Sequence, residues 1–161
     1  MPRSSFDHMD CSVAQTLEVI GEWWTLLILR NAFHGMRTFD AFQQQLDISS
    51  SVLSSRLKKL TDAGILEKQQ SSTDGRYFEY RLTESGFDIY PIIVSLMEWG
   101  EKWNPSPQGR RINLIEKATG KPVKGVAVLS AKGKPLHARE VVAVAGPGAD
   151  SQAEELVGYH S

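Results

Sequence analysis

Hydroxyl and basic side chains gather between residues 49 and 60, in a stretch suited to bind phosphate and nucleic-acid bases. The stretch contains five serines together with Arg56, Lys58 and Lys59, and it contains no acidic residue. Arginine and lysine bind phosphates and guanine, and serine hydroxyls exchange hydrogen bonds with base edges at close range. Because a local excess of positive charge favours contact with phosphate, the stretch predicts a surface for duplex DNA. A solvated helix face with capping serines is the alternative interpretation.

Hydrophobic spacing predicts two helices joined by a tight turn around this stretch. Thr38 is placed to cap the first helix, and residues 47–49 form the turn. Ser49 or Ser50 is placed to cap the second helix, whose exposed face is small, polar and basic. The core positions of the two helices are Phe39, Phe42, Leu46, Val52, Leu53, Leu57 and Leu60. The outward positions of the second helix are Ser51, Ser54, Ser55, Lys58 and Lys59.

A β-hairpin is expected directly after the second helix. A strand begins at Ile65, the polar tip SSTDG (71–75) reverses the chain, and RYFEYRL (76–82) returns. Alternation along the returning strand predicts that its residues Phe78, Tyr80 and Leu82 pack inward. Lys68 and Arg76 are expected near the tip, where a wing meets the minor groove or the DNA backbone. The sequence therefore predicts a winged helix-turn-helix, a mainly α fold with a β wing (α+β).

Further helices are expected on both sides of this unit. Residues 11–34 predict two helices broken near Gly21, with Trp24, Leu27 and Ile28 in the core. Thr83 is placed to cap a helix that runs to about residue 103 and is kinked or broken near Pro91. That helix carries an apolar stripe wider than one small domain needs, which implies a partner helix. The stripe consists of Ile89, Ile92, Ile93, Leu96, Met97, Trp99, Gly100 and Trp103.

Residues 11–103 resemble the HxlR-type helix-turn-helix regulators, winged-helix proteins close to the MarR type. The matching motifs are Cys11 before a helix, Gly21 followed by WTLLIL (24–29), FDAF (39–42), ISSSVLSSRLKKL (48–60), GIL (64–66), EYRLTESG (79–86), YP (90–91) and MEWG (97–100). The resemblance implies a homodimeric, sequence-specific regulator of transcription, expected to be a repressor, with residues 50–60 in the major groove. The two half-sites of a near-palindromic operator would then lie about 34 to 36 Å apart.

The polar helix face and the wing predict the DNA interface, and the resemblance implies the dimer interface. The expected DNA-binding residues are Thr38, Ser50, Ser51, Ser54, Ser55, Arg56, Lys58, Lys59, Lys68 and Arg76. The expected dimer residues, on the first and last helices, are Val13, Leu17, Ile93, Leu96, Met97, Gly100 and Trp103. Arg56 has a second interpretation, a structural ion pair on the side nearer the core. The chain departs from the family at Thr38, where an arginine is usual, and in the wing SSTDGRY, which lacks the usual proline.

Cys11 is the one cysteine of the chain, so a disulfide within one chain is excluded. Several members of the resembled family sense oxidants or electrophiles through an N-terminal cysteine, and the helix macrodipole favours a thiolate in a first turn. Asp10 opposes that effect. The alternatives are therefore a thiol-based redox sensor and an inert cysteine at the dimer interface. A small apolar effector in a cavity near Trp23, Trp99 and Trp103 is a further alternative to simple aromatic packing.

The chain beyond residue 104 predicts a small extension. The expected organisation is a DNA-binding and dimerisation domain (1–104), a linker (105–109), a small antiparallel β extension (110–148) and a flexible tail (149–161) with at most a short terminal helix. The strand-like pieces are RINLIEK (111–117), VKGVAVLS (123–130) and EVVAVAG (140–146). Two Gly-containing turns resemble the knuckles of a zinc ribbon, but Thr119, Leu129 and Lys132 stand where thiolates are expected. We therefore expect a remnant without metal or cofactor.

The composition of the chain limits the classes of protein to which it can belong. The chain has 161 residues, 41% of them hydrophobic, and a net charge of -1, so only local patches can attract phosphate. It lacks a run of about eighteen apolar residues and an N-terminal apolar stretch, so neither a membrane span nor export is indicated, and the cytoplasm is expected. Four scattered histidines and no paired carboxylates argue against an enzyme. A winged helix that binds proteins without DNA is the alternative, and salt-dependent duplex binding separates the two.

Overall fold

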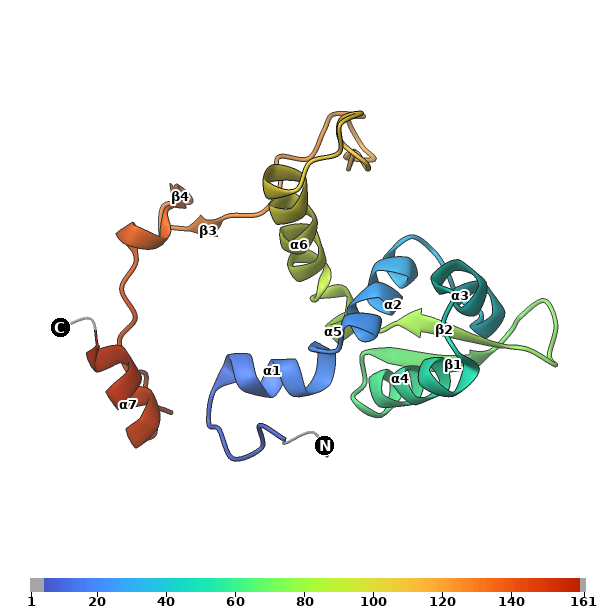
Figure 1. The fold of residues 1–161 in the computed structure, drawn as a ribbon, viewed down its shortest axis with the longest axis horizontal. Helices are drawn as coiled ribbons and strands as arrows, with labels where there is room; N and C mark the ends of the chain where they lie inside the picture. The colour runs from blue at the N-terminus through green and yellow to red at the C-terminus, as the bar shows by residue number, and fades with distance from the viewer. Residues whose placement is uncertain (1–4, 160–161) are drawn as a thin grey trace.

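The computed structural model describes residues 5–159 of the chain. The described elements are α1 (Ser12–Ile20), α2 (Trp23–Phe33), α3 (Phe39–Leu46), α4 (Ser50–Asp62), β1 (Leu66–Gln70), β2 (Phe78–Leu82), α5 (Glu84–Phe87), α6 (Tyr90–Trp103), β3 (Val128–Leu129), β4 (Pro135–Leu136), the 3-10 helix η1 (Ala138–Glu140) and α7 (Ser151–Gly158). Helices α2 to α4 and the β1–β2 hairpin pack together on one side of the molecule, and α6 begins against α2, so that its far end and the residues after it extend away (Figure 1). This arrangement confirms the predicted winged-helix α+β fold. No helix within residues 5–159 is long and apolar enough to cross a membrane.

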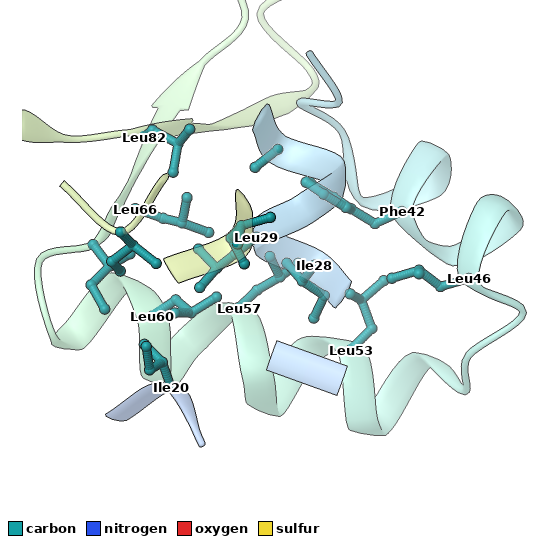
Figure 2. Packing of buried hydrophobic residues seen from close by; sticks show 14 of the residues in the cluster. Ile20, Ile28, Leu29, Phe42, Leu46, Leu53, Leu57, Leu60, Leu66 and Leu82 are labelled. Carbon is teal, nitrogen blue, oxygen red and sulfur yellow. The ribbon is translucent and has the colours of Figure 1, made fainter. Parts of the chain in front are cut away.

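The core forms where α2, α3 and α4 meet the wing. Leu53, Leu57 and Leu60 of α4 are fully buried, and they face Ile28 and Leu29 of α2 (Figure 2). Burying one such side chain contributes roughly 1.5–3 kcal/mol. Since these leucines recur at helical spacing, they fix which face of α4 turns inward and leave the opposite face to solvent.

The turn between α3 and α4 is built as the sequence predicts. Asp47 ends α3 in the left-handed conformation (φ 51°), which a short polar side chain tolerates. The Ser49 hydroxyl then caps α4 by accepting a hydrogen bond from the Val52 amide at 3.4 Å. The end of α3 and the start of α4 are therefore fixed by a left-handed residue and a capping hydroxyl within the turn.

The wing is a two-stranded antiparallel hairpin in which Leu66 pairs with Leu82 and Lys68 with Tyr80. The Tyr80 amide also donates to the Arg37 carbonyl at 2.7 Å, which joins the wing to the segment before α3. Two expectations need correction. Phe78 is exposed because it lies at the end of β2 beyond the core, and Lys68 lies in the middle of β1 rather than near the tip.

The helix expected from Thr83 to residue 103 is interrupted, as its proline suggested. Helix α5 ends at Phe87, and α6 begins at Tyr90 with Pro91 in its first turn, where a missing amide costs nothing. The Thr83 hydroxyl accepts from the Gly86 amide at 3.2 Å and donates to the Gly64 carbonyl at 2.5 Å, so it ties α5 to the end of α4.

The extension has antiparallel pairing as expected, but it contains less β structure than its sequence suggested. Strands β3 and β4 have two residues each, one isolated bridge joins Ile115 to Pro122, and residues 140–146 form no strand. The predicted antiparallel pairing is present in β3–β4, but residues 141–146 stay unpaired because a strand needs a neighbour or a core to cover it, and no residue between 110 and 159 is buried. The tail contains the short helix α7, capped by Asp150 through the Ala153 amide, which matches the most order expected there.

Candidate nucleic-acid interface

The outer face of α4 presents the hydroxyl and basic side chains that the sequence placed there. Its outward residues Ser51, Ser54, Ser55, Lys58 and Lys59 are all exposed. The inward leucines of the same helix are fully buried, so this face cannot rotate inward without emptying the core. Small side chains on an exposed helix allow close approach to a groove, and the flanking lysines can reach phosphates.

Gln43 of α3 is a positioning residue that the sequence reasoning missed. Its side-chain amide donates to the Ser50 hydroxyl at 2.7 Å and lies 3.4 Å from the Ile48 carbonyl. These contacts hold the first residue of α4 against α3 and orient the Ser50 hydroxyl. The run of three glutamines at 43–45, beside the turn, was the available signal.

The two lysines of α4 differ in their surroundings. Lys58 pairs with Asp62 one turn later, with 2.5 Å between the ammonium nitrogen and the carboxylate oxygen, and both side chains are well exposed. An exposed pair of this kind contributes about 0–1 kcal/mol, so a phosphate can replace the carboxylate. Lys59 has no ion pair with any residue of the described segment 5–159.

Arg56 turns away from this face. Its guanidinium lies 3.2 Å from the Glu22 carboxylate, and the two side chains are only 24% and 19% exposed. The pair joins α4 to the residue that precedes α2. The structure therefore favours the structural ion pair over the expected DNA contact for Arg56, because an arginine at this position points across the helix toward α2.

Arg76, the basic residue in the turn of the wing, forms an ion pair with Asp74. Arg76 donates two side-chain hydrogen bonds to Asp74, at 3.1 and 2.8 Å, in the turn between β1 and β2. Hydrogen bonds from Arg76 lower the pKa of the Asp74 carboxyl, and the same contact raises the pKa of the Arg76 guanidinium. The Lys68 ammonium lies 4.6 Å from the centre of the Phe78 ring. Both cations remain accessible, but Asp74 reduces the positive charge of the wing.

Thr38 and Arg37 hold the segment that enters α3. The Thr38 hydroxyl accepts from the Ala41 amide at 3.3 Å, which confirms the predicted cap. The Arg37 guanidinium donates to the Ala32 and Met36 carbonyls, each at 3.1 Å, and so satisfies backbone oxygens near the end of α2. Arg37 therefore has a structural role, which was not predicted from the sequence.

The expected dimer residues separate into two groups. Val13 and Leu17 of α1 and Leu96 and Trp103 of α6 are exposed, whereas Met97 and Gly100 are half-buried. Ile93 belongs to the core of its own chain at 6% exposure, so its assignment to a dimer interface is wrong. It is buried because this side of α6 packs on α2.

A cavity of about 310 Å³ lies between α2 and α6, lined by side chains that include Leu26, Leu27, Leu96 and Met97. It is not the cavity expected from the tryptophans. Trp23, Trp99 and Trp103 are all exposed and do not line it. Cys11 is half-buried and precedes α1, in a hollow that it shares with α7.

Comparison with known proteins identifies the same elements. A sequence model of the HxlR-like helix-turn-helix family matches residues 19–108. The HTH-type transcriptional regulator Rv3095 of Mycobacterium tuberculosis (strain H37Rv) is 41% identical over 137 residues, which cover 85% of this chain and 87% of that protein. The HTH-type transcriptional regulator YdeP of Bacillus subtilis (strain 168) is 30% identical and covers 71% of this chain and 87% of its own length.

Solved structures agree with these matches. The crystal structure of PA1607, a proposed transcription factor, superposes with a TM-score of 0.80 at 33% identity and covers 88% of this chain and 99% of its own. Because residues 1–109 supply only about two thirds of the chain, that match includes part of the extension. The redox regulator HypR in its oxidised form superposes with a TM-score of 0.53 at 31% identity, and covers 57% of this chain and 96% of its own.

The matched family segment contains the helix-turn-helix of α3 and α4, the wing, and the α6 helix whose geometry is described above. The similarity to Rv3095 extends over most of both chains, and the family model spans α2 to α6. The chain is therefore a transcriptional regulator with a helix-turn-helix DNA-binding fold, and it belongs to the HxlR-like helix-turn-helix family.

Proposed function

We propose that this regulator binds a near-palindromic operator in double-stranded DNA as a homodimer and acts as a repressor. The observation that carries the proposal is the outer face of α4, where Ser51, Ser54, Ser55, Lys58 and Lys59 stand exposed above a fully buried row of leucines. The hydroxyl groups are suited to base edges, and the lysines to phosphates. Thr38, Ser50, Lys68 and Arg76 are proposed to contact DNA beside this helix.

The dimer is proposed to form through α1 and α6. Val13, Leu17, Leu96, Trp99 and Trp103 of these helices are exposed, although they are large and apolar. A contiguous apolar surface of this kind on a soluble domain marks an interaction site. Two-fold symmetry would place the two copies of α4 about 34 to 36 Å apart, in successive major grooves.

Two sets of variants test the DNA interface. Lys58→Ala and Arg76→Ala should weaken binding to every duplex and lower the slope of log affinity against log salt by about 0.9 for each phosphate that the variant no longer neutralises. Ser51→Ala and Ser54→Ala should instead change the sequences selected from a random duplex pool, because hydroxyl groups read bases. Equal affinity and equal selection in all four variants would contradict the proposed face. A wild-type protein without salt-dependent duplex binding would favour a protein-interaction module.

Regulation through Cys11 is a second candidate function. It is favoured by the similarity to HypR, which is described as a redox regulator, and by the half-buried position of Cys11 before α1. As the one cysteine of the chain, it would form a disulfide with a second copy or with a small thiol, and an oxidant would accept the two electrons. Diamide treatment should lower operator affinity in the wild type and leave Cys11→Ser unchanged. Unaltered affinity after complete oxidation would exclude this regulation.

A small apolar effector is proposed to occupy the cavity between α2 and α6. The cavity is lined mainly by aliphatic side chains, together with Arg30, Glu101 and Arg111, so an apolar body with one polar group fits it best. Leu27→Trp should fill the cavity and abolish any shift in melting temperature caused by such a compound. A shift that survives this variant would place the effector elsewhere.

A further inference from the structure

Residues 110–159 form a long arm that has no core of its own. None of these residues is buried, although the arm contains several apolar side chains. The most exposed are Val128, Leu129, Val142, Val144, Leu156 and Tyr159. Ordering about fifty residues costs conformational entropy that only burial can offset. The arm therefore requires another surface to cover it.

The arm is attached to its own chain at both ends. At its start, Arg110 and Arg111 form ion pairs with Glu98 and Glu101 of α6. At its far end, α7 lies beside the start of α1, where Leu156 shares a hollow with Val13. Between these attachments the chain bows away from the winged helix in a wide arc (Figure 1). The uncovered valines at 141–144 belong to this arc.

The arc faces an apolar surface on α1 and α6. A groove of about 450 Å³ on these helices is lined by side chains that include Val13, Leu17, Ile92 and Leu96. This groove is continuous with the proposed dimer surface, which Trp99 and Trp103 extend along α6. A second copy that docks on α1 and α6 would therefore enter the space that the arm partly encircles.

We propose that the arm of each chain embraces the second copy, so that the partner covers the valines at 141–144. This inference rests on the proposed homodimer and extends its interface from α1 and α6 to the arm. Two copies that each place the arc of one arm against the other copy bury the apolar side chains that neither chain covers alone. The superposition on PA1607 includes part of the extension, so a similar course of the chain after α6 occurs in another protein of this fold.

Charge favours a copy of this chain as the occupant. Residues 110–159 contain eight basic and five acidic residues, a net charge of +3, whereas residues 1–109 contain ten basic and fourteen acidic residues, a net charge of -4. The arm and the winged-helix unit therefore carry opposite net charge, which favours their contact. Lys117, Lys121, Lys124, Lys132 and Lys134 have no carboxylate partner among residues 5–159 of their own chain. Nucleic acid is the competing occupant for these lysines.

Photocrosslinking in the full chain directly tests whether the arm of one chain contacts α1 or α6 of the other copy. Val144 is replaced by p-benzoylphenylalanine in a ¹⁵N-labelled chain, which is mixed with unlabelled wild-type protein and irradiated. The expected product is a covalent dimer in which a light peptide from α1 or α6 is joined to the heavy arm. The same group at Ser72, in the exposed wing turn, is the control and should give no such product. Crosslinks confined to the labelled chain, or none at Val144, overturn the proposal.

Sedimentation separates failure of this inference from failure of the homodimer. Val142→Asp combined with Val144→Asp should weaken dimerisation at least tenfold, which corresponds to about 1.4 kcal/mol. Ser72→Asp combined with Thr73→Asp adds the same charge outside the arm and should leave dimerisation unchanged. A wild-type dimer that the valine variant does not weaken overturns the arm alone, whereas a monomeric wild type overturns both proposals. If Lys132→Glu with Lys134→Glu abolishes duplex binding while the valine variant dimerises normally, the arm binds nucleic acid and the proposal is overturned.

Discussion

Replacing Arg56 with methionine distinguishes a structural arginine from a DNA contact. The ion pair between Arg56 and Glu22 is 3.2 Å long, and its side chains are 24% and 19% exposed. Exposed pairs contribute about 0–1 kcal/mol, and breaking a fully buried pair costs about 3–5 kcal/mol, so this half-buried pair lies between them. Glu22 stays at the N-terminus of α2 in the variant, where the helix dipole favours a carboxylate. We expect a loss of about 1–2 kcal/mol.

Two measurements test this assignment: thermal unfolding reports the loss of stability, and the salt dependence of DNA binding reports the loss of a phosphate contact. For a chain of this size, 1 kcal/mol shifts the melting temperature by about 2–4 °C, so Arg56→Met should melt roughly 2–8 °C lower at a fixed protein concentration. Its salt slope for duplex binding should equal that of the wild type. Lys59→Met is the matched control on the same helix. It should leave the melting temperature nearly unchanged and lower the salt slope by about 0.9 for each chain.

The opposite pattern would refute the assignment of Arg56. If Arg56→Met melts with the wild type and lowers the salt slope as Lys59→Met does, then its guanidinium binds phosphate in the complex. The pairing with Glu22 would in that case be an interaction that DNA replaces. A double-variant cycle with Glu22→Gln measures the coupling energy of the pair independently of DNA.

Three further predictions concern the wing, the packing of α5 and the root of the arm. Asp74→Asn removes the carboxylate beside the wing arginine and should raise affinity for every duplex, with a salt slope steeper by about 0.9 for each chain in filter-binding titrations. Gly86→Ala should lower the free energy of unfolding in urea by about 1–3 kcal/mol, because a Cβ there would collide with the Ile65 carbonyl oxygen. The Arg110 guanidinium lowers the pKa of the Glu98 carboxyl from its usual 4.5, so their ion pair stabilises the arm root above that pH and is lost as pH falls through the lowered value. The Arg110 Nη proton signals in NMR should follow this loss, because these groups donate to the Glu98 carboxylate, and Glu98→Gln should abolish the titration.

Local patterns were sufficient to predict the helix-turn-helix and the wing. Helical spacing of leucines set the buried face of α4, and the hydroxyls of Thr38, Ser49 and Thr83 cap the three helices that follow them. These features depend on neighbours within about four residues along the chain, so they can be read from the order of residues. The outward serines and lysines followed directly from the same periodicity.

Contacts between distant segments could not be predicted in this way. Arg56 meets Glu22, which is far earlier in the chain, and Gln43 meets Ser50 across the turn. Ile93 is inside the core because α6 crosses α2, although its spacing fits the exposed stripe equally well. A helical period assigns side chains to a face, but it does not say which neighbour covers that face.

Residue order alone established the winged helix, the family and the polar face of α4, because helix periods, caps and turn residues act over short distances. Packing in three dimensions decided which cations are free for DNA, which apolar side chains remain uncovered on α1 and α6, and that the extension is an arm without a core. These outcomes depend on the burial of each side chain by segments far along the chain, and burial is a property of the assembled fold.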